Sequence, residues 1–343
     1  MSTTESATGR PVSSSDGRGP ERGRPAEFRS YHGQPVIKEP IWTWQIPMYF
    51  FTGGVAGASA GLACLSELRG NEVLAKRAWA AAMAGIVASP ALLSSDLGKP
   101  TRFLNMLRMF KVTSPMSVGS WILSASGVTT ALAAANAWLG MFPRAGKVAK
   151  PAAALLGLPL STYTAALVSN TAVPVWHEAR RMLPFVFGSG AALSAGAAAV
   201  ALTPTEHARA ARRLALSAAL LEVGAKELMQ RQLGVYGEPY EQGISKQLGH
   251  LSRAAIVAGG AVLYRRGASS RAAAVAAGAL LSAGAISARW SVFKAGFQSA
   301  ADPKYVVLPQ RSRIRRGEQR GAARGSPNTA APDRKRGSPA VGA

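Results

Sequence analysis

The stretch GSGAALSAGAAAVAL, Gly188–Leu202, contains no charged residue and consists mainly of alanine, glycine and serine. A water-soluble helical bundle needs more leucine and isoleucine in its core and charges on every turn of its outer face. Small residues instead let helix backbones approach closely in lipid, where no hydrophobic force drives helices together. The stretch therefore predicts one helix of a membrane bundle.

Similar uncharged blocks recur along the middle of the chain. TGGVAGASAGLA (Thr52–Ala63) and AAAVAAGALLSAGAISA (Ala272–Ala288) have the same small-residue composition. A helix of about 20 apolar residues crosses the hydrocarbon core of a bilayer. Six blocks meet this requirement, some with help from flanking residues: Ile46–Ser66, Ala78–Ser95, Val112–Pro143, Pro151–Trp176, Met182–Thr205 and Ala272–Ala288. We predict an all-α, polytopic membrane helix bundle.

Two further segments carry charges within an apolar pattern. Ala208–Met229 contains Glu222 and Lys226, and Leu248–Tyr264 has a histidine and an arginine near its start. Both segments can span if their charges face the bundle interior or reach the interface. The alternative is an amphipathic hairpin on the membrane surface. We expect about eight membrane helices, with six as the alternative, and the number is even in both cases.

The net charge of +23, from 40 lysines and arginines against 17 acidic residues, is concentrated in the two tails. The mean hydropathy of +0.09 averages these polar tails with an apolar middle. Residues 1–40 and 311–343 are rich in Ser, Gly, Pro and Arg, so we predict disordered basic tails around a helix bundle at 41–310. This distribution argues against a nucleic-acid-binding domain, and no signal peptide is expected.

An even number of spans places both tails on one side of the membrane. Cytoplasmic segments of membrane proteins carry an excess of lysine and arginine. The internal loops are nearly balanced in charge, so the tails decide the orientation. We expect a multi-pass protein of the cell (inner or plasma) membrane with both termini in the cytoplasm.

The chain has few residues that bind redox metals. Cys64 is the single cysteine, and iron–sulfur clusters need several thiolates. None of the four histidines lies in the middle of an apolar block, where the axial ligands of a membrane haem would be needed. We therefore expect no haem and no iron–sulfur cluster in this chain.

A polar segment, SSDLGKPTRFLNMLRMFKVTSPMSVGSW (Ser94–Trp121), separates the second block from the third. Pro100 suits the first turn of a new helix. The residues after it form an apolar face and a basic face, as in a short helix that lies in the membrane interface.

This segment resembles the signature of the NrfD and polysulfide-reductase membrane subunits. Three other stretches agree with it: IPMYFFTGGVAGASAG (Ile46–Gly61), STYTAALVSNTAVPVWHEAR (Ser161–Arg180) and ADPKYVVLPQ (Ala301–Gln310). The resemblance covers about residues 40–310. It implies an eight-helix subunit without haem that binds menaquinone or another quinone. It also implies two partners, a four-cluster ferredoxin-like iron–sulfur subunit and a molybdopterin catalytic subunit.

A quinone site needs an apolar slot, a polar group at each carbonyl and a route for protons. The cluster that exchanges electrons with the quinone belongs to the partner, so the site should lie at the membrane face where the partner docks. The chain brings the ends of the first four spans together at one face. The candidate quinone-binding residues there are Gln45, Tyr49, Asp96, Arg102, Trp121, Tyr163, Asn170 and His177.

Tyr163 and Asn170 are seven residues apart, which predicts one helix face for both. The resemblance implies a tyrosine of this helix in the quinone pocket and favours Tyr163.

Each candidate also has a purely structural interpretation. Tryptophans near span ends (Trp42, Trp44 and Trp176) are typical interfacial anchors, and arginines there bind lipid phosphates. Asp96 can form a salt bridge with Lys99 or Arg102 that only fixes the loop. His177 can be an ordinary loop residue, and the polar side chains of the fourth span can only link helices by hydrogen bonds.

Glu222 and Lys226 are four residues apart on one helix face and can pair. Glu222 lies roughly 13 Å along the helix from Arg213, near the middle of the bilayer if this helix spans it. Ionisable groups at that depth indicate either a proton path or a structural ion pair. Two rival functions remain open: an ion or solute transporter that uses these two residues, and a purely structural membrane anchor.

Overall fold

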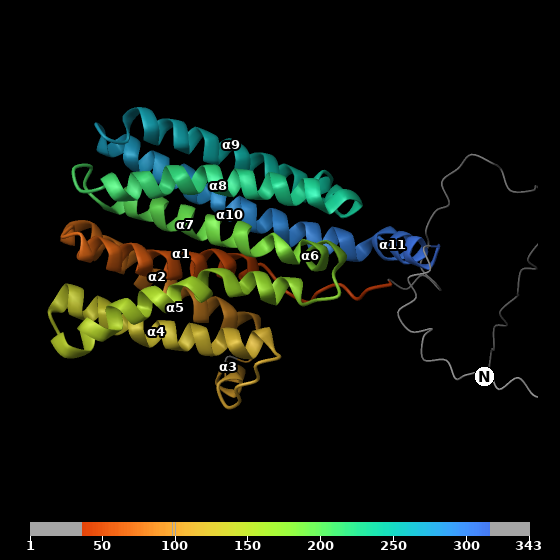
Figure 1. Ribbon diagram of the computed structural model, residues 1–343, viewed down its shortest axis with the longest axis horizontal. Helices are drawn as coiled ribbons and strands as arrows, with labels where there is room; N and C mark the ends of the chain where they lie inside the picture. Colours follow the sequence, from red (N-terminus) through yellow and green to blue (C-terminus); the bar gives the residue numbers. More distant parts are fainter. Residues whose placement is uncertain (1–35, 98, 100, 316–343) are drawn as a thin grey trace, which may run out of the picture.

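The computed structural model describes residues 36–97, 99 and 101–315, and within these residues the protein is a bundle of long helices without a strand (Figure 1). The long helices are α1 (Gln45–Leu68), α2 (Glu72–Asp96), α4 (Pro115–Leu139), α5 (Pro143–Ser169), α7 (Leu183–Leu202), α8 (Arg209–Leu233), α9 (Gly243–Arg266) and α10 (Arg271–Ala301). Shorter helices are α3 (Arg102–Met106), α6 (Pro174–Glu178), η2 (Ala179–Arg181), η3 (Gly234–Tyr240) and α11 (Lys304–Arg315). The predicted all-α class is confirmed.

The bundle has two halves of four long helices each. In the first half α1 packs on α2 and α5, and α5 packs on α4; in the second half α7 packs on α8 and α10, and α10 packs on α9. Contacts of α1 with α7 and α10 join the halves. Figure 1 shows the two halves as adjacent layers of antiparallel helices.

The number of spans follows from helix length and position. Six helices are long and apolar enough to cross a membrane: α1, α2, α4, α5, α7 and α10. The more polar helices α8 and α9 are equally long and lie beside α7 and α10 along the bundle (Figure 1). This arrangement favours eight spans over a surface hairpin.

The first and last described segments lie at the same end of the bundle, where α1, α4, α7 and α9 begin (Figure 1). We call it the termini end. An even number of long helices produces this arrangement, as the sequence predicts. Residues 1–35 and 316–343 of the predicted tails lie outside the described residues, and α11 continues past residue 311 to Arg315.

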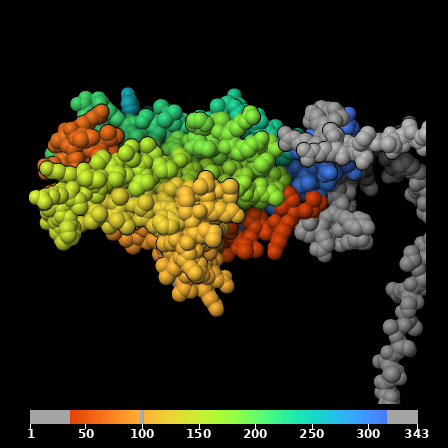
Figure 2. Space-filling view, turned by 60° about the horizontal axis from the view of Figure 1, so that its bottom comes forward, coloured from red at the N-terminus to blue at the C-terminus, as the bar shows by residue number. Residues whose placement is uncertain are grey.

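Several helix boundaries have simple local causes. Ser114 caps α4 by accepting a hydrogen bond from the Ser117 backbone N–H at 3.4 Å, and Pro115 occupies the first turn. Gly140, with φ of 66°, ends the same helix in the left-handed region that glycine adopts without strain. The expected short helix after the second span is α3, which buries none of its side chains, and the segment around it projects from the bundle (Figure 2).

The fourth span was predicted too far toward the C-terminus. α5 ends at Ser169, so Asn170 is its C-cap and the residues after it lie outside the helix. Asparagine favours helix ends because its side chain competes for backbone hydrogen bonds. The expectation that Trp176 is an interfacial anchor is also wrong. Its ring is fully buried, stacks on Trp42 at 5.5 Å and donates from Nε1 to the Val292 carbonyl at 2.8 Å.

Close helix contacts depend on residues without a large side chain. The backbones of α1 and α5 meet at Gly57 and Gly157, where a Cβ on either residue would collide with the carbonyl oxygen of the other. Gly61, one turn further along α1, has no atom within 4 Å of its Cβ position. Small residues allow this approach, which supplies dispersion contacts in place of a hydrophobic driving force.

We predict that Gly57→Ala destabilises the protein by about 1–3 kcal/mol, because the added methyl group overpacks the contact between α1 and α5. Gly61→Ala is the matched control on the same helix. It should be neutral or stabilising by up to ~1 kcal/mol, because alanine is the better helix former. Thermal unfolding midpoints in one detergent measure both, and equal midpoints for the two variants would contradict the close contact.

Candidate functional site

A small cavity lies in the first half at the termini end. Its volume is about 40 Å³. Apolar side chains dominate its wall, and they come from the segment before α1, from α1, α2, α4 and α5, and from the segment around α3. The lining residues are Trp42, Ile46, Tyr49, Leu93, Asp96, Leu97, Met106, Met116, Ser120, Tyr163 and Leu167. We call it the tyrosine cavity.

Two tyrosine rings meet in this cavity. Tyr49 is 1 % exposed, and its hydroxyl has no hydrogen-bond partner among the described residues. The ring of Tyr163 approaches it edge-on with 6.4 Å between centroids. Gly119 makes room for Tyr163, since a Cβ at this position would collide with the tyrosine ring. A buried hydroxyl without a partner costs about 1–3 kcal/mol, so this group is a candidate to contact a polar ligand atom.

Asp96 forms the polar edge of the tyrosine cavity. Its Oδ1 accepts hydrogen bonds from the Thr43 hydroxyl at 2.6 Å and from the Thr43 backbone N–H at 3.2 Å. The Thr43 hydroxyl also contacts the side-chain oxygen of Gln45. Within the described residues Asp96 makes neither of the salt bridges that the sequence allows. The carboxylate therefore ties the end of α2 to the segment before α1.

A second group of polar residues is buried in the other half. Glu222 and Lys226 of α8 and Arg289 of α10 are 1 %, 9 % and 2 % exposed, and we call them the charge cluster. The Ser189 hydroxyl donates to Glu222 Oε2 at 2.8 Å. Glu222 Oε1 and Lys226 Nζ have no hydrogen-bond partner among the described residues. Buried charges without full pairing are expensive, which makes this cluster a candidate for function.

Backbone groups of α7 hold Arg289 in place. Its guanidinium donates to the carbonyl oxygens of Phe187 at 2.8 Å and Val186 at 3.3 Å, and it lies over the Phe187 ring at 4.2 Å. Gly190 provides space, because a Cβ there would press on Arg289 and on Glu222. α10 thus contributes a cation opposite the acid of α8.

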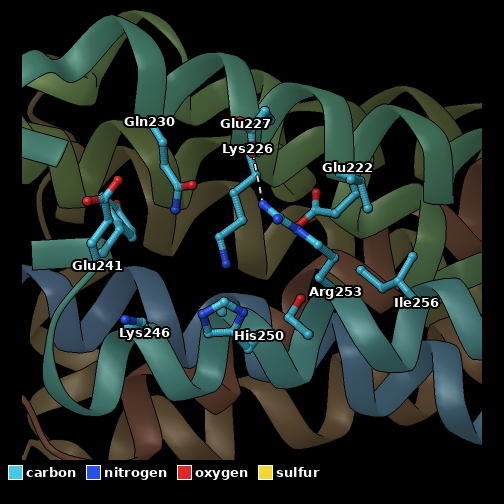
Figure 3. Close-up of a pocket in the computed structure, with 13 residues that line it drawn as sticks. Glu222, Lys226, Glu227, Gln230, Glu241, Lys246, His250, Arg253 and Ile256 are labelled. Carbon is cyan, nitrogen blue, oxygen red and sulfur yellow. Dashed lines mark hydrogen bonds and ion pairs between the residues drawn. The ribbon is translucent and has the colours of Figure 1, made fainter. Parts of the chain in front are cut away.

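A polar cavity of about 350 Å³ lies between α8 and α9 and reaches the charge cluster (Figure 3). Lys226 extends its ammonium group into this space, and Glu222 stands at one side. Glu241, Lys246 and His250 line it near the start of α9. The polar cavity therefore connects buried charges with polar side chains near the termini end.

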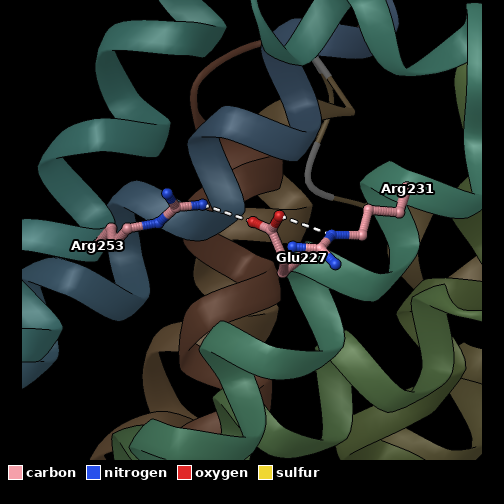
Figure 4. A network of polar contacts seen from close by, with 3 residues as sticks. All are labelled: Glu227, Arg231 and Arg253. Carbon is pink, nitrogen blue, oxygen red and sulfur yellow. Dashed lines mark hydrogen bonds and ion pairs between the residues drawn. The ribbon is translucent and has the colours of Figure 1, made fainter.

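Two lining residues of the polar cavity, Glu227 and Arg253, belong to a polar network with Arg231 (Figure 4). Glu227 accepts from Arg231 Nε at 3.0 Å, one turn along α8, and from Arg253 Nη2 of α9 at 2.8 Å. All three side chains are partly exposed, so each pair contributes under about 1 kcal/mol. Their main effect is to connect α8 and α9.

The stretch after the last span is fixed by ion pairs. Lys304 Nζ lies 2.6 Å from Glu238 Oε2 and 3.6 Å from Asp302 Oδ2. The hydrogen bond between Lys304 and Glu238 raises the pKa of Lys304 and lowers the pKa of Glu238. Tyr305 donates its hydroxyl to the same Glu238 oxygen at 3.2 Å. These contacts attach the start of α11 to η3 at the termini end.

The sequence matches the polysulfide reductase (NrfD) family over residues 29–302, which is most of the chain and includes both halves of the bundle. The chain belongs to this family. No curated protein and no solved structure matched it. The family assignment confirms the resemblance that the loop after the second span and three further stretches indicate. It also supports a membrane subunit that interacts with quinone.

Three of the eight predicted quinone-binding residues line one cavity of this NrfD-family protein. Tyr49 comes from α1, Asp96 ends α2, and Tyr163 lies on α5. These three residues lie together at the termini end because α1 begins there, whereas α2 and α5 end there.

The other five predicted residues lie outside the lining of the tyrosine cavity. They are Gln45, Arg102, Trp121, Asn170 and His177. Gln45 contacts Thr43 beside Asp96. Arg102 is exposed and donates to the Leu97 carbonyl at 3.2 Å, while exposed Trp121 reaches the Met109 carbonyl at 3.5 Å. These two residues therefore shape the loop between α2 and α4.

The other two lie beyond the end of α5. Asn170 is exposed at the end of the helix, and exposed His177 places Nδ1 3.3 Å from the Ser169 carbonyl. Neither side chain is among the lining residues of the tyrosine cavity.

The sequence analysis missed several residues of the two sites. Ser120 and Met116 line the tyrosine cavity from α4, and Met106 reaches it from α3. Met116 and Ser120 are four residues apart, which indicates that they share one helix face. The sequence does not show which face of this span points inward, because all its faces have a similar composition. Arg289 was missed because it follows the last uncharged block. α10 continues to Ala301, so Arg289 lies inside the helix and not at its end.

No metal site is present within residues 36–97, 99 and 101–315, where no three His, Cys, Asp or Glu side chains gather. The side chains with polar groups around the tyrosine cavity are two phenols, a serine hydroxyl, one carboxylate and the indole of Trp42. Such groups form hydrogen bonds to carbonyl and hydroxyl oxygens. They fit the head group of a quinone or quinol.

Proposed function

We propose that this chain is the quinone-handling membrane subunit of a multi-subunit oxidoreductase. In this proposal it exchanges electrons between menaquinone or a similar quinone and a partner iron–sulfur subunit, which serves a molybdopterin catalytic subunit. The main observation behind this proposal is the buried Tyr49 hydroxyl, which lies in an apolar cavity beside Tyr163 and Asp96. It has no hydrogen-bond partner among the described residues. Family membership supports the same function.

The size of the tyrosine cavity defines how a quinone would bind. About 40 Å³ accommodates a few water molecules at most, so a quinone ring needs additional space. Leu97 and Met106 form part of the wall, and they belong to the segment around α3. α3 buries none of its side chains, so displacement of this segment breaks few contacts. We propose that the head group enters the cavity beneath it.

Reduction of a quinone consumes two electrons and two protons. The Tyr49 hydroxyl would donate a hydrogen bond to one carbonyl oxygen, and the Tyr163 ring would position the head group from the side. Asp96 is partly exposed, so its carboxylate would exchange protons between the site and water. The apolar wall keeps bulk water away from the reacting head group.

We predict that Tyr49→Phe lowers quinol-coupled turnover of the purified complex by about tenfold, as expected for one lost hydrogen bond of ~1.4 kcal/mol. Tyr264→Phe is the matched control, since Tyr264 is 80 % exposed on α9. Activity of the catalytic partner with a soluble dye should be unchanged in both variants. Equal quinol-coupled rates for the two variants would support the purely structural anchor instead.

We further propose that the polar cavity and the charge cluster form a proton path. Glu222 and Lys226 both have an unpartnered polar atom, and the cavity links them with ionisable side chains near the termini end. Arg289 adds a third charge that the sequence analysis did not include. An ion or solute transporter built on Glu222 and Lys226 is the competing function for the same residues.

We predict that Glu222→Gln reduces the number of protons moved per electron in the complex reconstituted in vesicles. The exposed Glu206 provides the control Glu206→Gln, which should leave this ratio unchanged. A lower unfolding temperature with an unchanged proton ratio would mean a structural ion pair. Ion or solute flux through the isolated chain without a redox partner would instead favour the transporter.

For orientation, we propose that the termini end faces the cytoplasm and that the partner docks there. The support is the basic composition of both tails together with their attachment at one end of the bundle.

We predict that added protease removes both tails in inverted membrane vesicles, because the cytoplasmic face points outward in them. The same tails should be protected in intact spheroplasts, which serve as the control. Protection in inverted vesicles with cleavage in spheroplasts would reverse the orientation and place the partner outside the cell.

A further inference from the structure

A long apolar groove runs along the outside of the first half between α2 and α4. Its volume is about 770 Å³. Seven residues of α2 and five of α4 line it, and most are alanines: Trp79, Ala80, Met83, Ala84, Val87, Ala88, Ala91, Ala131, Ala134, Ala135, Trp138 and Leu139. We call it the alanine groove. It exists because α2 and α4 pack mainly on α1 and α5 and contact each other less.

Two indole rings mark the end of the alanine groove that lies opposite the termini end. Trp138 is half exposed and donates from Nε1 to the Lys76 carbonyl at 3.1 Å. Trp79 is buried and donates from Nε1 to Glu67 Oε1 at 2.9 Å. Partly exposed tryptophans such as Trp138 lie at the level of lipid headgroups. This end of the groove is therefore at the membrane interface.

Positive charge gathers at the same end. Lys76 is exposed and lies one turn before Ala80, so it continues the groove-lining stripe of α2. Arg77 follows it, and Arg144 and Lys147 lie in the first turns of α5, close in sequence to the end of α4. Within the described residues none of these four forms a salt bridge.

The acids of this end do not neutralise that charge. Glu67 is occupied by Lys150, whose Nζ lies 2.8 Å from its Oε2. Glu72 at the start of α2 and Glu206 in the loop before α8 are further acids at this end, and both are exposed. At the start of α2, within the described residues, the exposed Lys76 and Arg77 without a salt bridge therefore outnumber the exposed Glu72.

The length of the groove identifies the kind of occupant. From Trp79 to Ala91 the lining covers roughly 18 Å of α2, and from Ala131 to Leu139 roughly 12 Å of α4, at 1.5 Å per residue. One leaflet of the hydrocarbon core is about 15 Å deep, whereas a helix of another subunit would cross about 30 Å. The groove thus matches a single acyl chain that enters from the headgroup level.

We propose that the alanine groove is a binding site for an anionic phospholipid. One acyl chain lies along the alanines, and the phosphate contacts Lys76 and Arg77 at the mouth. Basic pockets between membrane helices recognise acidic headgroups in this way. The lipid would fill the space between α2 and α4 and hold the first half together at the end opposite the tyrosine cavity.

The test measures lipid retained by the full-length chain, purified in its complex, by native mass spectrometry after addition of phosphatidylglycerol or phosphatidylcholine. We expect the wild type to retain phosphatidylglycerol in preference to phosphatidylcholine. The double variant Lys76→Gln, Arg77→Gln should weaken this retention by about fivefold for each charge removed. Arg265→Gln, at an exposed arginine near the end of α9, is the matched control and should retain the lipid.

A second pair of variants tests the groove itself. Ala84→Leu fills the groove without changing charge and should also reduce retention of phosphatidylglycerol. Ala276→Leu adds the same volume at an exposed position of α10 and should not. Unfolding temperatures of both variants show that the fold is kept.

Two results would overturn the proposal. Equal retention of the two lipids in the wild type, insensitive to the charge variants, would mean ordinary annular lipid. A photo-crosslink from position 84 to another polypeptide, with no bound lipid, would mean that a helix of a partner or of a second copy occupies the groove.

Discussion

The contact of two helix backbones at Gly57 and Gly157 determines where the first half places its functional groups. Lipid provides no hydrophobic force between helices, so close packing of small residues must hold α1 against α5. Tyr49 lies about 12 Å from this crossing along α1, and Tyr163 about 9 Å along α5, both toward the termini end. The crossing therefore brings the two rings to 6.4 Å from each other.

The two halves of the bundle have different interiors. The first half closes around aromatic and apolar side chains and leaves the buried Tyr49 hydroxyl without a hydrogen-bond partner among the described residues. The second half encloses Glu222, Lys226 and Arg289, and a larger polar cavity reaches Glu222 and Lys226. The two halves thus differ in polarity: one encloses a mainly apolar cavity, and the other encloses buried charges. Contacts of α1 with α7 and α10 keep both sites in one rigid bundle.

Much of the candidate site followed from the order of spans, because alternating helix direction decides which helix ends meet. Tyr49, Asp96 and Tyr163 were found in this way. Asn170 and His177 do not line the tyrosine cavity, and the end of α5 at Ser169 depends on local capping, which a uniform apolar block does not reveal. The buried position of Arg289 was not predicted, because a charge at the edge of an uncharged block is typical of a helix end. Only packing against the Phe187 and Val186 carbonyls explains its position inside α10.

The sequence by itself determined the helical class, the membrane location, the even number of long helices and the family. These properties follow from composition and from the approximate length of the uncharged blocks. Both can be read without knowing which helices pack against each other. The tertiary structure decided which residues share a cavity, that α8 and α9 lie in the bundle, and that α2 and α4 leave a groove. Alanine-rich helices carry similar side chains on every face. The rotation of each helix about its own axis is therefore decided only by the positions where helix backbones come into contact.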